Sequence, residues 1–327
     1  MKETQLSTTD IHTSRIGLGT WAIGGWMWGG TDEDLSIETI RRALIEGVGL
    51  IDTAPIYGFG ESERIVGQAL KGLERSSFEL ATKVGIEWHE GNPYRNGSRD
   101  RILKEIEDSL TRLDTDYIDV YQVHWPDPNV AIEETAAVMR ELYEQQLIRA
   151  IGVSNFSVEQ MQQFMEHAPL HSCQPPYNLF ERGIEGELKP FCKQNGIALI
   201  TYGALCRGLL TGKMNGDTRF EGDDLRNVDP KFQEPRYSQY LGAVERLKKV
   251  AEKYQKSLVQ LSVNWILQQD VEVALWGARK PEQLADIDGA TDWEISDEDM
   301  QQIDQILQEE IDNPIGPDFM APPARET

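Results

Sequence analysis

Short apolar segments alternate with amphipathic segments along most of the chain. The apolar segments have the length of buried strands, and in the segments that follow them apolar residues recur every three or four positions. Ile37, Ile40 and Leu44, for example, would share one face of a helix. We predict strands at 16–19, 50–52, 78–83, 117–124, 150–154, 172–174, 198–202 and 273–276. We predict helices after them at 34–46, 61–70, 100–113, 131–145, 158–167, 186–195, 241–255 with 258–268, and 281–289.

Eight strand-then-helix units without a linker predict a single α/β domain over residues 1–327, folded as a parallel (β/α)8 TIM barrel. A doubly wound sheet is the alternative, and the absence of a strand–GxGxxG–helix unit weakens it. Three additions to the barrel are expected. They are an N-terminal β-hairpin at 5–13, a long aperiodic loop at 213–240, and a C-terminal acidic helix and tail at 296–327, with the helix itself at 297–308.

The charge of the chain limits its partners. A formal net charge of −23 argues against nucleic acid and against anionic membranes, because both attract basic surfaces. Acidic residues crowd 286–312, where Lys and Arg are absent, and we expect a solvated face there. Cys173, Cys192 and Cys206 lack the spacing of a metal site, so we expect reduced thiols and no metal. The chain has no secretory signal and no run of the ~20 apolar residues that cross a membrane, which predicts a cytoplasmic location.

Polar residues end several predicted strands, and in a TIM barrel these ends meet at one mouth, where the chemistry lies. Asp52 ends the second strand, Lys83 the third and His124 the fourth. Tyr57 lies on the loop after Asp52. A buried carboxylate needs a cationic partner, and Lys83 on the neighbouring strand can provide it. We expect the Lys83 ammonium to favour ionisation of the Tyr57 phenol, and His124 to donate a hydrogen bond to a polar substrate atom.

Each of these four residues has an ordinary interpretation when it is taken alone: a cap, a surface lysine, a loop aromatic and an interior histidine. Their conjunction at successive strand ends favours an acid–base site. A Schiff-base lyase is an alternative, because a lysine at a barrel strand end can form an imine with a carbonyl compound. Asp52 is expected to keep Lys83 charged, which disfavours nucleophilic attack.

Seven motifs, in order, resemble the aldo-keto reductases. They are GLGTW at 17–21, IDTAPIYGFGESERIVGQAL at 51–70, LATKVG at 80–85, LDTDYIDVYQVHWPD at 113–127, IGVSNF at 151–156, QPPYN at 174–178 and LLTGK at 209–213. The resemblance covers about residues 15–306. Three further segments, WAIGGWMWGGTDED, YGALCRGLLTGK and GPDFMAPPARE, are similar to the bacterial general-stress members of that family.

The resemblance implies NADPH-dependent reduction of aldehydes and ketones by a tetrad of Asp52, Tyr57, Lys83 and His124, with Tyr57 as the general acid. It also implies a binding site for NADPH or NADP+ along the barrel mouth. The implied cofactor contacts are Thr20, Trp21, Asp52, Ser154, Asn155, Gln174, Tyr202, Gly203, Ala204, Leu205, Arg207, Gly208, Lys213, Gly277, Ala278, Arg279, Lys280, Gln283 and Asp286.

Within that set, the resemblance assigns the carboxamide to Ser154, Asn155 and Gln174 and the nicotinamide ring to Tyr202. It assigns the pyrophosphate to the segment 203–209 and the adenosine phosphate to the segment 277–280 together with Gln283. Two departures from the family pattern occur. Gly203-Ala204 stands where many relatives have serine and proline, which removes a hydroxyl contact. Gln283 replaces an arginine of some branches, which leaves Arg279 and Lys280 as the main cations.

The substrate is expected to be a small-molecule carbonyl compound. The predicted substrate pocket consists of Trp21, Trp26, Trp28, Tyr57, His124 and Trp125. Residues that could latch the long loop over the cofactor are Asp223, Asp224, Arg226, Lys231 and Arg236, with a solvated charged loop as the equal alternative. A cofactor-binding regulatory subunit of the potassium-channel β type is a further alternative, which the short segment before the barrel disfavours. We expect a monomer or a weak homo-oligomer.

Overall fold

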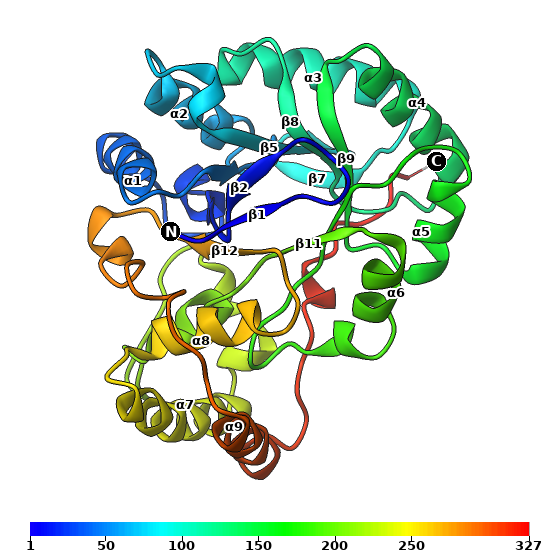
Figure 1. The fold of residues 1–327 in the computed structure, drawn as a ribbon. Coiled ribbons are helices and arrows are strands. Elements are labelled where there is room, and N and C mark those ends of the chain that lie inside the picture. The colour runs from blue at the N-terminus through cyan, green and yellow to red at the C-terminus, as the bar shows by residue number, and fades with distance from the viewer. Residues whose placement is uncertain (327) are drawn as a thin grey trace.

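The computed structural model describes residues 1–326 and shows a closed barrel of eight parallel strands (Figure 1). The strands are β3 (Ile16–Gly19), β4 (Leu50–Asp52), β5 (Glu79–Val84), β8 (Ile118–Val123), β9 (Ile148–Ser154), β10 (Ser172–Gln174), β11 (Ala198–Thr201) and β12 (Val273–Gly277). They pair in chain order, and β12 closes the barrel on β3. The predicted (β/α)8 TIM barrel is therefore confirmed, and every observed strand begins and ends within about two residues of its prediction.

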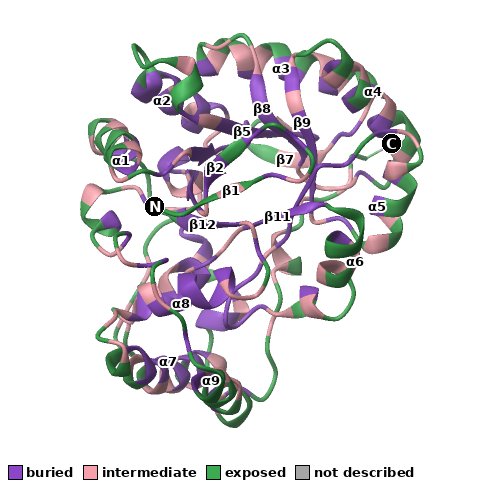
Figure 2. Cartoon of the chain, in the orientation of Figure 1, coloured by how far each residue is buried: buried purple, intermediate pink, exposed green. Residues whose placement is uncertain are grey.

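Amphipathic helices surround the barrel and bury their apolar faces against it or, as α7 and α9 do, against one another (Figure 2). They are α1 (Glu33–Ile45), α2 (Glu61–Leu70), α3 (Arg99–Leu113), α4 (Ile132–Glu144), α5 (Val158–Met165), α6 (Leu188–Asn195), α7 (Arg236–Lys253), α8 (Leu258–Leu267) and α9 (Asp297–Glu310). Capping boxes at Ser157 and Ser257 define where α5 and α8 begin. Within residues 1–326, no helix has both the length and the apolar character that a bilayer crossing requires.

Two hairpins lie outside the barrel. β1 (Glu3–Gln5) and β2 (His12–Ser14) form the expected N-terminal hairpin, which runs across one end of the barrel (Figure 1). β6 (Ile86–His89) and β7 (Asn92–Arg95) form a second hairpin, which was not predicted. Its two turn residues, Glu90-Gly91, both have the positive φ that a type I′ turn requires, and a glycine at this place is the signal that could have revealed it.

Two predicted helix boundaries are wrong. The helix expected at 281–289 is only a 3-10 turn at Pro281–Leu284. Trp276 Nε1 donates to the Gln283 carbonyl (3.0 Å), which a longer helix would use in its own hydrogen bonds. α7 begins at Arg236 and not at 241, so the long loop ends at Pro235, which takes the N-cap position of α7. The loop also contains two 3-10 turns, at Leu225–Asn227 and Pro230–Phe232.

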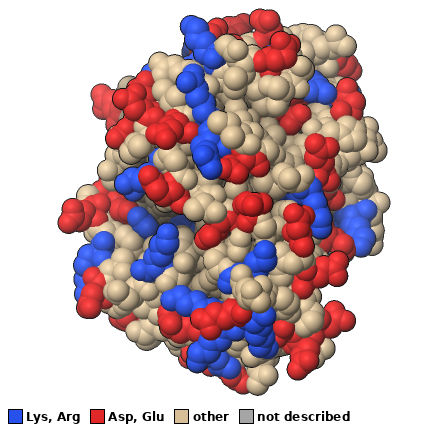
Figure 3. All heavy atoms as spheres, turned by 60° about the vertical axis from the view of Figure 1, so that its left-hand side comes forward, with Lys and Arg blue, Asp and Glu red and all other residues tan. Residues whose placement is uncertain are grey.

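The acidic C-terminal helix is more than a solvated face. α9 packs against α7 and buries Ile303 and Ile306. Four of its carboxylates form ion pairs with other helices or loops: Asp299 with Lys253, Asp304 with Arg182, and both Glu309 and Glu310 with Arg246. Figure 3 shows the same mixing on one face of the molecule, where basic side chains lie among more numerous acidic ones.

Candidate active site

Asp52, Lys83 and Tyr57 meet at the mouth of the barrel. β4 and β5 are neighbouring strands, so the end of one brings Asp52 beside Lys83 of the other. Lys83 Nζ donates to Asp52 Oδ2 (2.7 Å), to the Thr53 carbonyl (2.9 Å) and to the Tyr57 hydroxyl (3.3 Å). The Lys83 side chain is fully buried and that of Asp52 is 3% exposed. The ammonium therefore has three oxygen partners and stays fixed beneath the phenol.

The Tyr57 phenol is a protonated acid at neutral pH. Burial raises its pKa well above the ordinary value, and the Asp52 carboxylate adds to this effect. The net direction in the free protein is therefore toward the protonated phenol, although the Lys83 ammonium, 3.3 Å from the hydroxyl, favours the phenolate once the proton leaves. Burial also lowers the pKa of Lys83, while the attraction of Asp52 opposes that change.

His124 completes the group. Its backbone amide donates to the Val84 carbonyl (2.8 Å), and its ring stands edge-on to Tyr57 with centroids 5.8 Å apart. Burial, followed by the charge of Lys83, lowers the pKa of His124 well below its ordinary value. The imidazole is therefore neutral at pH 7, with one N–H to donate and one nitrogen to accept.

The second oxygen of Asp52 is bound by two amides. Gln174 Nε2 lies 2.8 Å from Asp52 Oδ1, and Gln122 Nε2 lies 3.2 Å from it. Gln122 was not predicted as a site residue. A polar residue inside a buried strand, two positions before His124, is the sequence signal that could have identified it.

A chain of hydrogen bonds links the next three strand ends. Tyr202 donates its hydroxyl proton to Asn155 Oδ1 (2.9 Å). Asn155 Nδ2 reaches the His124 carbonyl and Ser154 Oγ, both at 3.0 Å. Ser154 Oγ in turn donates to the Gln174 carbonyl (2.8 Å). The predicted carboxamide residues therefore lie together and hold one another in place.

A cavity of about 310 Å³ opens above these residues. Of the predicted substrate-pocket residues, Trp21, Trp26, Tyr57, His124 and Trp125 line it. Trp28 does not line it and instead packs edge-on against Trp21, with ring centroids 5.4 Å apart. Among the described residues, no Asp, Glu, Lys or Arg lines the cavity.

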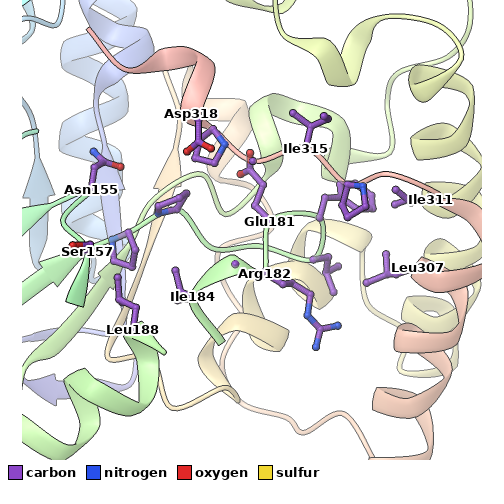
Figure 4. A pocket seen from close by; sticks show the side chains of 18 of the residues that line it. Asn155, Ser157, Glu181, Arg182, Ile184, Leu188, Leu307, Ile311, Ile315 and Asp318 are labelled. Atoms are coloured by element: carbon purple, nitrogen blue, oxygen red, sulfur yellow. The ribbon is translucent and has the colours of Figure 1, made fainter. Parts of the chain in front are cut away.

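The C-terminal segment forms one wall of this cavity, which was not predicted. Residues 319–323 line it, and the main chain there is tied down where Arg95 N donates to the Pro323 carbonyl (2.9 Å). Asn129 Nδ2 also donates to the Arg325 carbonyl (2.7 Å). A larger cavity, of about 820 Å³, is lined in part by residues 314–318 and shares Trp125 and Asn155 with the first. Figure 4 shows its lining, with Asn155 and Asp318 labelled.

The predicted pyrophosphate loop has an unusual backbone. Gly203, Cys206, Arg207 and Gly208 all have positive φ, and Gly203 explains one departure from the family pattern, because a serine at φ 75° would be strained. Three of these residues are consecutive, and the amides of Cys206 and Gly208 donate within the loop, to the carbonyls of Gly203 (2.7 Å) and Leu205 (2.9 Å). The loop is thus a tight turn that its own hydrogen bonds hold after the end of β11.

The Arg207 side chain points elsewhere. Its guanidinium is buried and pairs with Glu181 (2.7 Å) and Asp229 (2.5 Å). Lys231 Nζ lies 2.8 Å from the same Glu181. Burial favours a neutral Glu181, but Arg207 and Lys231 outweigh it and hold the pKa of this carboxyl below its ordinary value. Arg207 therefore anchors the long loop to the barrel, and its side chain is not free to bind phosphate.

The long loop is latched across the mouth onto the segment after β3. Asp223 accepts from the backbone amides of Met27 (2.9 Å) and Gly29 (3.3 Å). Arg226 pairs with Asp224 and lies over the Trp28 ring at 5.4 Å. Of the predicted latch residues, Asp223, Asp224 and Arg226 thus bind this segment or support it. Lys231 binds the barrel side, and Arg236 lies in α7, outside the latch.

Several predicted cofactor residues are already engaged within the protein. Arg279 donates to the carbonyls of Trp28 (2.6 Å) and Gly30 (3.3 Å). Gln283 Oε1 accepts from the amides of Arg279 and Lys280, so it closes that turn. The Thr20 hydroxyl is buried against the Asp52 carbonyl (2.9 Å). The remaining members on this side are Gly277, Lys213 and Lys280, which are exposed, Ala278, which is buried, and Asp286, which is half-buried.

A closed (β/α)8 barrel with a buried Asp–Lys pair, a protonated tyrosine and a neutral histidine at its mouth defines an acid–base site of the reductase type. A sequence profile of the Aldo/keto reductase family matches residues 15–308. The chain therefore belongs to the aldo/keto reductase family, whose members are oxidoreductases that act on carbonyl groups and use nicotinamide cofactors.

Three relatives illustrate the likeness. Aldo-keto reductase YhdN of Bacillus subtilis (strain 168) is 58% identical over 100% of this chain and 99% of its own. The NADH-specific methylglyoxal reductase of Escherichia coli (strain K12) is 39% identical over 91% of this chain and 96% of its own. The structure of the glycerol dehydrogenase AKR11B4 from Gluconobacter oxydans matches with a TM-score of 0.89 and 49% identity, over 98% of this chain and 99% of that one.

Proposed function

We propose that this protein is an NADPH-dependent reductase of uncharged aldehydes and ketones, with Tyr57 as its general acid. The observation that carries the proposal is the Tyr57 hydroxyl itself. It is protonated, lies 3.3 Å from the Lys83 ammonium and opens onto a cavity without charged side chains. The other three members of the tetrad act by fixing or complementing that hydroxyl.

The chemistry divides between the cofactor and the chain. A bound reduced nicotinamide supplies a hydride to the carbonyl carbon. Tyr57 donates its proton to the carbonyl oxygen as negative charge develops there, and the Lys83 ammonium stabilises the resulting phenolate. Asp52 keeps Lys83 charged and in place. His124 donates its single N–H to the carbonyl oxygen and so helps to orient the substrate. Because its imidazole is neutral, it does not repel the nearby Lys83 ammonium.

The residues present fit a nicotinamide cofactor. For the pyrophosphate we propose the positive-φ loop at 203–208, through amides other than those of Cys206 and Gly208, which donate within the loop. The Tyr202 ring lines the cavity where its hydroxyl is held by Asn155. For the adenosine phosphate we propose Arg279 and Lys280. The two carbonyl partners of Arg279 are weaker acceptors than a phosphate dianion, so an exchange of partners favours NADPH. The Escherichia coli relative is named as NADH-specific, so the preference of this protein for NADPH over NADH has to be measured directly.

The alternatives fit the site less well. A Schiff-base lyase needs a neutral, mobile lysine, whereas Lys83 has three oxygen partners and a carboxylate beside it. A purely regulatory cofactor-binding role does not require the protonated phenol above the ammonium.

We further propose a cytoplasmic monomer or weak homo-oligomer that removes carbonyl compounds under stress. This proposal rests on the likeness to general-stress enzymes.

The test is a coupled assay with purified protein. NADPH and NADH are each followed at 340 nm with methylglyoxal, 4-nitrobenzaldehyde and 4-carboxybenzaldehyde. We expect substrate-dependent oxidation of NADPH with the first two compounds and a much lower kcat/KM for the carboxylate, which the uncharged cavity cannot pair. Absence of oxidation with every carbonyl compound would contradict the reductase assignment.

A further inference from the structure

Gln122 is a fully buried amide to which neither the motifs nor the tetrad assigns a role. It lies in β8 beneath the mouth of the barrel and contacts both Asp52 and Gln174. A buried amide costs free energy unless its groups are paired, so its partners indicate what it does.

The Asp52 carboxylate fixes the orientation of both amides. Its Oδ1 accepts from Gln174 Nε2 (2.8 Å) and from Gln122 Nε2 (3.2 Å). The reverse orientation of either amide would bring its oxygen against a carboxylate oxygen. Gln122 Oε1 then faces the remaining N–H of Gln174 and accepts from it at 3.2 Å. The three side chains thus have one consistent arrangement of donors and acceptors.

This arrangement changes what Gln174 offers to a ligand. Both hydrogens of its amide are used inside the protein, by Asp52 and by Gln122. Its Oε1 accepts no hydrogen bond from any of residues 1–326, and Gln174 lines the cavity. Gln174 is therefore an acceptor toward that cavity and not a donor.

The fold makes room for Gln122 at Gly152. β8 and β9 are neighbours, and Gln122 is in register with Gly152. A Cβ on Gly152 would lie 2.7 Å from Gln122 Cγ and 2.5 Å from Ser172 Oγ, both closer than real contacts allow. A side chain at this position would displace the amide.

We propose that Gln122 is a positioning residue that makes Gln174 a hydrogen-bond acceptor, and that the site thereby selects a coenzyme whose carboxamide NH2 can donate. Without Gln122, one N–H of Gln174 loses its partner and the amide is free to turn. The inference rests on the proposed coenzyme function. Its consequence is a preference for the carboxamide over a group of similar shape that has no N–H.

The test compares two nucleotides by binding, not by turnover. NADP+ and its 3-acetylpyridine analogue, in which an acetyl group replaces the carboxamide, are titrated by quenching of tryptophan fluorescence. We expect the wild type to bind NADP+ about 3- to 10-fold more tightly, the range of one neutral hydrogen bond. Gln122→Met has a similar shape without the amide, and we expect its two Kd values to agree within about twofold.

A matched control separates positioning from general damage. Gln268 at the end of α8 accepts from the Ile295 amide (2.8 Å), far from the cavity, so Gln268→Met should leave the preference unchanged. Gly152→Ala displaces the Gln122 amide without removing it, and it should lose the preference as Gln122→Met does. If Gln122→Met does not fold, Gly152→Ala alone tests the role of Gln122.

The outcomes are distinct. A preference kept in both folded variants, or absent from the wild type, overturns the role of Gln122 while coenzyme binding itself stands. A wild-type protein that binds neither NADP+ nor NAD+ overturns the proposed function together with this inference.

Discussion

Replacing Tyr57 by phenylalanine removes one oxygen atom and separates catalysis from stability. The hydroxyl lies 3.3 Å from Lys83 Nζ. When the phenol gives up its proton, phenolate and ammonium at this distance attract each other by about 5 kcal/mol at an effective dielectric constant near 20. That attraction is absent while the phenol is neutral, so it acts as the transition state is reached. We expect Tyr57→Phe to lower kcat by roughly 10²-fold or more, which is at least about 2.7 kcal/mol.

The same substitution should change the free energy of unfolding only slightly. Lys83 keeps Asp52 and the Thr53 carbonyl as partners, so no buried charge loses its counter-charge. The loss of one hydrogen bond costs about 1 kcal/mol, a small shift in Tm for a chain of this size. Binding of the coenzyme should also stay within about twofold, because the hydroxyl is not one of its proposed anchors.

The assay is steady-state kinetics at saturating NADPH, with thermal unfolding of the same samples. Tyr254→Phe is the matched control, since it removes a hydroxyl that donates to Asp299 (2.5 Å) between α7 and α9, outside the barrel. That control should keep full kcat. A Tyr57→Phe protein that folds normally and turns over at a near-normal rate would refute the role of Tyr57 as the acid.

Three further predictions follow from the site. Borohydride added with a carbonyl substrate should trap no adduct on Lys83, and stoichiometric labelling of that lysine in mass spectrometry would favour the lyase. Arg279→Ala should raise the Kd of NADPH by roughly 10- to 100-fold and that of NADH much less; equal losses would show that Arg279 serves mainly the carbonyls of Trp28 and Gly30. Finally, the free energy of unfolding should decrease as pH falls from 6.5 to 5.5. Burial lowers the pKa of His124 in the folded chain, so as the pH falls the unfolded chain takes up the proton first. Protonation stabilises the unfolded chain, and the free energy of unfolding then decreases by up to ~1.4 kcal/mol per pH unit. His124→Gln should show a shallower decrease, whereas an unchanged slope would mean that folded His124 accepts the proton.

The barrel and the tetrad could be predicted because their signals are local. Strand and helix periodicities are visible in the sequence, and neighbouring strands in a TIM barrel bring their carboxyl ends together, so Asp52 and Lys83 had to meet. The pKa of Tyr57 could not be predicted in the same way. Its direction depends on how completely the phenol is buried, and burial is a property of the assembled mouth.

Most of the remaining differences at the site involve partners distant in sequence. Arg207 resembles a phosphate ligand in the sequence, but Glu181 and Asp229 bind it inside the fold. Trp28 belongs to an indole-rich segment, yet only its neighbours reach the cavity. The C-terminal wall at 319–323 comes from a proline-rich tail without periodicity, whose position is set by hydrogen bonds to Arg95 and Asn129. No spacing rule connects these residues.

The most direct test of the central claim, reduction of a carbonyl group at the Tyr57 site, is the fate of the transferred hydrogen. Reduced coenzyme labelled with deuterium at C4 on each face in turn is incubated with an aldehyde that the wild type reduces, and the alcohol product is examined by mass spectrometry and NMR. We predict one deuterium on the carbinol carbon for one labelled face only, and at most about a hundredth of that product with Tyr57→Phe at matched protein concentration within the wild-type reaction time. An alcohol formed by the wild type without deuterium from either face would contradict the account.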